Sequence, residues 1–174
     1  MELKIEYLSR LSPNIVDKLI FINKIRNGYA EEYLHDSRTF TFNETMAWFF
    51  KLNYDDGLQG YYIVKDKNDV IGYVRIANYS KINKRVMIGV DIAPEFSVKG
   101  YATNVYKYMI EFLFRDFDLN KISLEVLATN ERAIKLYTKL KFKFEGIKRQ
   151  DILKGDAFVD SIIMSILKSE YTSK

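Results

Sequence analysis

The feature that most limits what this chain can fold into is the order in which two kinds of hydrophobic period follow each other. Residues 3–7 alternate apolar and charged side chains, which is the period of a half-buried strand. Helical periods follow in two stretches before residue 61, in one after Gly100 and in one after Asn130. The remaining strand patterns cover residues 61–65, 70–77, 85–92, 122–127, 142–151 and 157–167. This order predicts an α/β (α+β) fold with a mixed central sheet of about seven strands flanked by about four helices.

Local signals predict where the first two helices begin and end. Ser12 and Pro13 fit the N-cap and the first helical position, and Gly28 is a stop signal. Thr41 and Glu44 have the spacing of a capping box, in which each side chain bonds the backbone N–H of the other residue. We therefore expect the second helix to start at Thr41.

Composition limits the chemistry that is open to the chain. Its 174 residues suit a single domain over 1–174, and it contains no cysteine and one histidine, His35. Disulfides, thiolate zinc sites, a cysteine nucleophile and a histidine-rich metal site are therefore excluded, and we expect no metal. The N-terminus lacks an apolar signal core and no run of about 18 apolar residues occurs, so we expect a cytoplasmic protein without membrane contact.

The charge pattern points to small anionic ligands. The net charge is +4, and acidic and basic residues are mixed along the chain. This mixture argues against a nucleic-acid stripe, so we expect no nucleic-acid partner. A mild positive balance still favours ligands such as coenzyme A or a nucleotide.

Residues 90–103 combine the end of a strand, a short loop with Gly100 and an immediate helix start. The first amides of a helix have no partner within the helix, and the helix dipole adds positive potential there. Glycine lets a ligand approach the backbone closely. The segment has the make-up of a seat for a pyrophosphate. A single glycine before a helix is nevertheless more often only a turn.

This segment resembles the coenzyme-binding motif of the GNAT acetyltransferase superfamily, Gln/Arg-x-x-Gly-x-Gly/Ala. Gly100 and Ala102 match its two small positions, whereas Ser97 departs from the Gln/Arg position and Lys99 is a substitute cation. A second stretch, residues 124–142, resembles the next strand and helix of the family, with Lys141 in place of the usual glycine. Its matching residues are Asn130, Ala133, Leu136, Tyr137 and Phe142.

The resemblance covers roughly residues 3 to 168, and it implies an acetyl-CoA-dependent N-acetyltransferase that passes the acetyl group directly to an amine. It implies a splayed strand pair that admits the pantetheine arm, and it places coenzyme binding in residues 90–112 and at Asn130. Asn130 also fits a helix N-cap. The coenzyme-binding residues we expect are Val90, Ile92, Val98, Lys99, Gly100, Tyr101, Ala102, Thr103 and Asn130.

The resemblance also gives Tyr137 the role of a proton donor to the departing thiolate. A phenol has a pKa near 10, so it is protonated at neutral pH. Tyr137 could equally pack on the helix face with Leu136. The base that takes the proton of the amine is Asp91, Glu125, His35 or a water chain, and Glu125 is slightly favoured.

The N-terminal half is where this family sets its acceptor. Arg26, Asn27, His35 and Trp48 resemble the pattern of GNAT members that acetylate amino groups on nucleotide-linked deoxysugars, so we expect a nucleotide-linked 4-amino-dideoxysugar as acceptor. Arg26 would bind a phosphate, or else pair with Glu31 or Glu32 on the surface. Trp48 would stack on a base or sugar, or else lie in the core.

Two rival functions and the oligomeric state stay open. The first rival is the same chemistry on a protein N-terminus or a polyamine. A polyamine site needs a cluster of acidic residues facing the pocket, and the pair Glu31 and Glu32 is weak support for one. The second is a non-catalytic acyl-CoA-binding module, which the departures at Ser97 and Lys141 favour. A homodimer is compatible with the sequence, which does not fix the oligomeric state.

Overall fold

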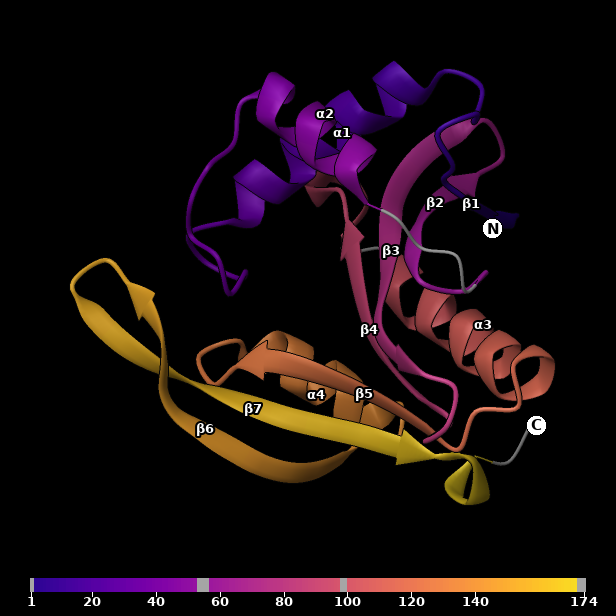
Figure 1. Cartoon of the computed structure of the whole chain (residues 1–174). Coiled ribbons are helices and arrows are strands. Elements are labelled where there is room, and N and C mark those ends of the chain that lie inside the picture. Colours follow the sequence, from indigo (N-terminus) through magenta and orange to yellow (C-terminus); the bar gives the residue numbers. More distant parts are fainter. Residues whose placement is uncertain (1, 53–56, 98–99, 172–174) are drawn as a thin grey trace.

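The computed structural model describes residues 2–52, 57–97 and 100–171, and these form a seven-stranded sheet (Figure 1). The strand order is β1-β2-β3-β4-β5-β7-β6, and only β4 and β5 run parallel. The strands are β1 (Leu3–Tyr7), β2 (Gly60–Asp66), β3 (Asp69–Ser80), β4 (Arg85–Ile92), β5 (Lys121–Leu127), β6 (Lys143–Lys154) and β7 (Ala157–Leu167). The helices are α1 (Ile15–Tyr29), α2 (Phe42–Lys51), α3 (Tyr101–Asp116) and α4 (Glu131–Lys139). The predicted fold class is confirmed.

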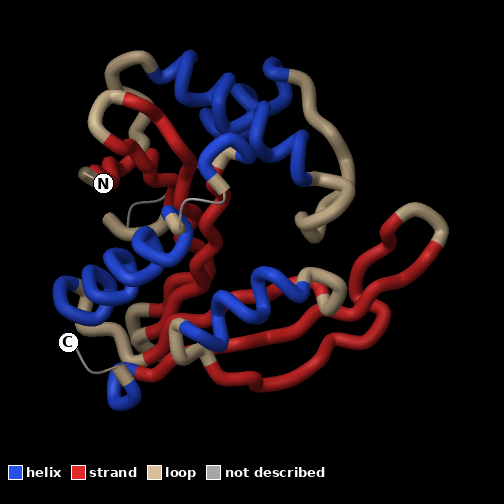
Figure 2. The backbone as a smooth tube through the Cα atoms, turned by 180° about the vertical axis from the view of Figure 1, so that it is seen from behind, coloured by secondary structure: helices blue, strands red, loops and turns tan. Residues whose placement is uncertain are grey.

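Helices cover both faces of the sheet, as the two opposite views in Figures 1 and 2 show. The buried side chains accordingly form two separate cores. Alternation along the strands sends Tyr62, Val64 and Val74 to the face covered by α3. The intervening residues Ile63 and Tyr73 face α1 and α2. Helix α4 packs on the same core as α3. No helix in the described part of the chain has both the length and the apolar character needed to cross a bilayer.

The start of α2 was predicted correctly, whereas the start of α1 was not. Thr41 accepts a hydrogen bond from Glu44 N at 3.2 Å, and the Glu44 carboxylate accepts one from Thr41 N at 2.8 Å, which completes the capping box. Helix α1 instead begins after Asn14, which has a left-handed φ of 53° and makes no side-chain cap. The predicted cap Ser12 accepts from Ser9 N, at 3.0 Å, so its hydroxyl serves the preceding turn. The helix also continues through Gly28 to Tyr29.

The hairpin of β6 and β7 reaches back to the N-terminal half. Lys154 Nζ donates to the carbonyl of Ala30 at 2.7 Å and to that of Leu34. Ser37 Oγ donates to the carbonyl of Leu153 at 3.3 Å. An ammonium at the C-terminal end of α1 complements the helix dipole. These bonds hold residues 30–37, which follow α1, beside the hairpin.

Candidate functional site

The site begins where β4 and β5 separate. The two parallel strands pair at Arg85 with Lys121, at Val86 with Ile122 and at Met87 with Ser123. Beyond these rows the described residues of β4 and β5 no longer pair, and a cavity of about 1230 Å³ opens between them. The splayed pair is the opening that the family resemblance implies for a pantetheine arm.

One end of the cavity is formed by the start of α3. Gly100 precedes the helix with a left-handed φ of 75°, and a Cβ at this position would meet no atom within 4 Å. The backbone amides of the first turn therefore face open space beside the cavity. Of the expected coenzyme residues, Val90, Ile92, Gly100, Ala102, Thr103 and Asn130 line the cavity.

The remaining three expected coenzyme residues do not line the cavity or cannot be placed. Val98 and Lys99 lie outside the described residues. Tyr101 is only 8% exposed, belongs to the core under α3 and donates its hydroxyl to Asp66. Its side chain therefore anchors α3 to the β2–β3 hairpin, and only its backbone is available to a ligand.

Asn130 is the N-cap of α4 and Tyr137 lies on that helix, and both line the cavity. Asn130 Oδ1 accepts from Ala133 N at 3.1 Å, which confirms the N-cap of α4. The hydroxyl groups of Tyr106 and Tyr137 are 3.2 Å apart, with Tyr106 donating. Burial raises the pKa of Tyr137, so its hydroxyl is protonated over the neutral range. Its proton can therefore be donated into the cavity, whereas its role as the acid stays a prediction.

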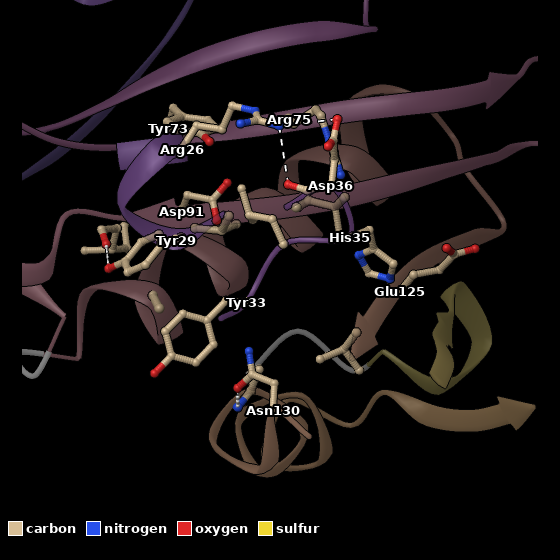
Figure 3. Close-up of a pocket in the computed structure, with 18 of the residues that line it drawn as sticks. Arg26, Tyr29, Tyr33, His35, Asp36, Tyr73, Arg75, Asp91, Glu125 and Asn130 are labelled. Atoms are coloured by element: carbon tan, nitrogen blue, oxygen red, sulfur yellow. Dashed lines mark hydrogen bonds and ion pairs between the residues drawn. The ribbon is translucent and has the colours of Figure 1, made fainter. Parts of the chain in front are cut away.

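Asp91 is the carboxylate at the centre of the cavity (Figure 3). Burial raises the pKa of Asp91, while a hydrogen bond from Tyr73 and the charge of Arg75 oppose the rise. The pKa values of four surrounding tyrosines are raised, first by burial and also by the Asp91 charge: Tyr29, Tyr73, Tyr106 and Tyr137. Asp91 is thus a carboxylate with increased basicity close to the proposed acid.

Glu125, the slightly favoured base, has a different environment. Lys148 Nζ lies 2.5 Å from Glu125 Oε1 and satisfies its charge. His35 lies beside it (Figure 3). Asp151 completes the group, and the ligand-type atoms of the three residues are within 4.8 Å of one another. Burial lowers the pKa of His35, and its Nε2 is buried without a hydrogen-bond partner among the residues that the structure describes. Because Lys148 already supplies a cation, an ion-pair network explains this group better than a metal site.

Arg26 and Asn27 hold the segment that follows α1. Arg26 pairs with Asp36 at 3.4 Å, donates to the carbonyl of Arg38 and stacks 4.1 Å above the ring of Phe40 (Figure 3 shows the ion pair). The acidic partner of Arg26 is Asp36. The predicted alternative, a surface ion pair with Glu31 or Glu32, is therefore wrong. The Asn27 amide donates to Phe40 O at 2.8 Å and accepts from Phe40 N at 3.0 Å.

Of the four residues expected to bind the acceptor, three line the cavity and one does not. Asn27 does not line the cavity, because its amide is used by the Phe40 backbone. Arg26 lines it, but much of its guanidinium is occupied. His35 and Trp48 also line it, and Trp48 is 38% exposed with its ring 5.1 Å from that of Tyr61. Trp48 therefore borders the cavity and also packs on the core through Tyr61.

Sequence reasoning missed Arg75 on β3. The strand register sets it opposite Gly89 on β4, and its Nη2 lies 3.6 Å from where a Cβ of Gly89 would be. The absence of a side chain at Gly89 lets the guanidinium lie over β4 and into the cavity, where Arg75 is exposed. An arginine within a strand pattern was the only available signal, and its partner depends on a register that the sequence does not reveal.

Comparison with known proteins agrees with this geometry. The sequence model described as "Acetyltransferase (GNAT) family" matches residues 22–142. A spermidine N(1)-acetyltransferase of Vibrio cholerae is 25% identical over 157 residues, which cover 90% of this chain and 91% of that protein. The uncharacterized N-acetyltransferase p20 of Bacillus licheniformis is 32% identical over 109 residues. That alignment spans 63% of this chain and only 61% of the relative.

A solved structure extends the similarity to the whole fold. The crystal structure of spermidine N-acetyltransferase from Vibrio cholerae in complex with CoA and spermine has a TM-score of 0.86 and 26% identity, and the match covers 98% of both chains. The relatives named here are thus spermidine acetyltransferases or proteins without an assigned acceptor, and they do not support the nucleotide-sugar branch. With the family's motifs, its splayed strand pair and its fold in place, the chain belongs to the GNAT family of acetyltransferases.

Proposed function

We propose that this chain transfers an acetyl group from acetyl-CoA to a primary amine of a small molecule. The observation that carries the proposal is that Asp91 and Tyr137 line the same cavity at the splayed end of β4 and β5, close enough for the Asp91 charge to raise the pKa of Tyr137. In the proposed reaction the amine nitrogen forms a bond to the acetyl carbon as the carbon–sulfur bond breaks. Asp91 takes the proton from nitrogen, and Tyr137 gives its proton to the departing sulfur.

The residues around Gly100 fit acetyl-CoA as the co-substrate. The open space at Gly100 and the free amides of the first turn of α3 suit a pyrophosphate. Arg132 lies nearby, donating to the carbonyl of Ser97, and it supplies a cation at the position where Ser97 departs from the family motif. The similarity to an enzyme solved with CoA supports the same choice.

A polyamine is the acceptor class that the relatives favour. The sequence relative and the solved structure from Vibrio cholerae named above are both described as a spermidine acetyltransferase, and the structure was solved with spermine. The cavity contains carboxylates that could hold a second ammonium group, among them Asp91, Glu125 and Asp151. Two of these carboxylates have cationic neighbours, because Glu125 is paired with Lys148 and Asp91 lies near Arg75.

A nucleotide-linked amino sugar is the second acceptor class, and Arg75 is the observation that favours it. A guanidinium that opens on the cavity suits a phosphate or another oxyanion of the acceptor. The relatives named above give this class no support, so it depends on the charge of the cavity alone. A homo-oligomer larger than a dimer is also proposed, because a similar Vibrio cholerae structure is described as dodecameric, with a TM-score of 0.81 and 25% identity.

A thiol-release assay with acetyl-CoA tests the function. The acceptors are spermidine, a nucleotide-linked amino sugar and a peptide with a free N-terminus. We expect turnover with at least one small amine and none with the peptide. Tight coenzyme binding without turnover on any amine would contradict the proposal and favour a non-catalytic acyl-CoA-binding module.

A further inference from the structure

Two of the four arginines that line the cavity, Arg75 and Arg132, have no carboxylate partner in the described part of the chain. Arg26 and Arg38 share the carboxylate of Asp36, at 3.4 and 2.8 Å. Arg132 donates to the carbonyl of Ser97 at 2.5 Å. Arg75 has a hydrogen bond with the hydroxyl of Tyr61, and it makes no ion pair with any carboxylate in the described part of the chain. A guanidinium has five N–H donors in a planar fork, so most of the fork is left for a ligand.

The strand register fixes where that fork lies relative to the proposed base. Tyr73 stands opposite Asp91, and Arg75 stands opposite Gly89, one row further along the same face of the sheet. Two residues along a strand span about 7 Å. An acceptor amine at Asp91 would therefore have the Arg75 guanidinium a few bonds away.

The charge of Arg75 then discriminates between acceptors. An oxyanion a few bonds from the amine would form charge-assisted hydrogen bonds with the guanidinium. A polyamine would instead bring a second ammonium group close to the guanidinium, and like charges repel. Arg75 should therefore favour an acceptor with an oxyanion over a polyamine.

We infer that Arg75 is the specificity-determining residue of the acceptor site and selects amines that carry an oxyanion, a carboxylate or a phosphate, a few bonds from the reacting nitrogen. The inference rests on the proposed acetyl transfer and names the substrate class of that same site. It does not require Arg75 to touch the acetyl group or the departing sulfur.

Matched acceptors test the inference, because the members of each pair share a short alkyl chain with an amine and carry far groups of opposite charge. The pairs are 4-aminobutyrate with 1,4-diaminobutane, and 3-aminopropyl phosphate with 1,3-diaminopropane. We expect the wild type to have the higher kcat/KM for the anionic member of each pair. Arg75→Gln should reduce that preference by about 10- to 100-fold. Arg75→Lys should recover part of it, since an ammonium cannot form the bidentate contact. The pair with the larger preference identifies the oxyanion.

Arg38→Gln is the matched control, because Arg38 also lines the cavity but is 76% exposed and bonded to Asp36. The ratio of kcat/KM for the anionic acceptor to kcat/KM for the diamine should be the same in Arg38→Gln as in the wild type. A wild type that prefers the diamines, with a ratio unchanged in Arg75→Gln, would overturn the inference and leave the acetyl transfer intact. An equal loss on both members of each pair would also overturn it, because Arg75 would then only position Asp91. Turnover on no amine at all would remove both proposals.

Discussion

Replacing Tyr137 with phenylalanine should separate catalysis from packing at the centre of the site. The ring keeps its contacts, with centroids 5.4 Å from Tyr106 and 6.0 Å from Phe142. The lost hydroxyl accepts a hydrogen bond from Tyr106, which is 1% exposed, so one buried donor loses its acceptor. That change should cost about 1–3 kcal/mol of unfolding free energy. If Tyr137 is the acid, kcat should also fall by roughly 10²-fold or more, because the departing sulfur loses its proton donor.

The matched control is Tyr106→Phe, which removes the other hydroxyl of the same hydrogen bond and leaves the Tyr137 proton in place. It should lose a similar amount of stability and much less of kcat. The assay is thiol release in single-turnover conditions, with urea unfolding of the same samples. A Tyr137→Phe protein with wild-type kcat while chemistry limits the rate would refute the acid role and leave Tyr137 as a packing residue.

Three further substitutions test the base, the coenzyme seat and the backbone. Asp91→Asn should lower kcat/KM by about 10²-fold or more and remove the acid limb of the pH profile. Because burial raises the pKa of Asp91, that limb lies above the range of an ordinary aspartate in the wild type, and a wild-type profile without it would exclude Asp91 as the base. Gly100→Val should raise the acetyl-CoA dissociation constant measured by calorimetry. Gly155→Val, which has a similar left-handed φ of 57° and lies outside the cavity, should not. Lys141→Gly should raise stability by up to about 1 kcal/mol, since Lys141 has a φ of 73°, whereas Lys139→Gly at the end of α4 should lower it in the same thermal unfolding assay.

The fold was predictable because its signals are local. The hydrophobic period of a helix or strand and the residues that begin or end it can be read within a few positions of the chain. The capping box of Thr41 and Glu44 is an example. The start of α1 shows the limit of such signals. Ser12 has the right residue type for a cap, but its hydroxyl is used by Ser9 in the preceding turn. Sequence alone cannot decide which of two nearby backbone groups a short polar side chain will bond.

The coenzyme half of the site was also largely predictable, since Gly100, Ala102 and Thr103 follow one another in the chain and line the cavity. The acceptor half depends on contacts between distant segments. Asp91 and Arg75 share the cavity only because β3 and β4 pair in one register, and a slip of β3 by one residue would turn Arg75 to the face opposite Asp91. Glu125 was favoured over Asp91 as the base because the sequence does not show that Lys148, on β6, pairs with Glu125.

The residues that suggested a nucleotide sugar have a structural explanation that changes what their pattern can mean. Arg26 and Asn27 bind the backbone of residues 36–40, and Phe40 is held by both of them. A pattern of this kind would be retained in any enzyme that needs this segment as a wall of the acceptor cavity, whatever the acceptor is. It therefore identifies the scaffold of the acceptor half rather than its ligand. The side chains that can tell one amine from another are those that no carboxylate pairs with among the described residues. Arg75 and Arg132 are cations of this kind, and Arg75, set over Gly89, is the one whose charge acts on Asp91.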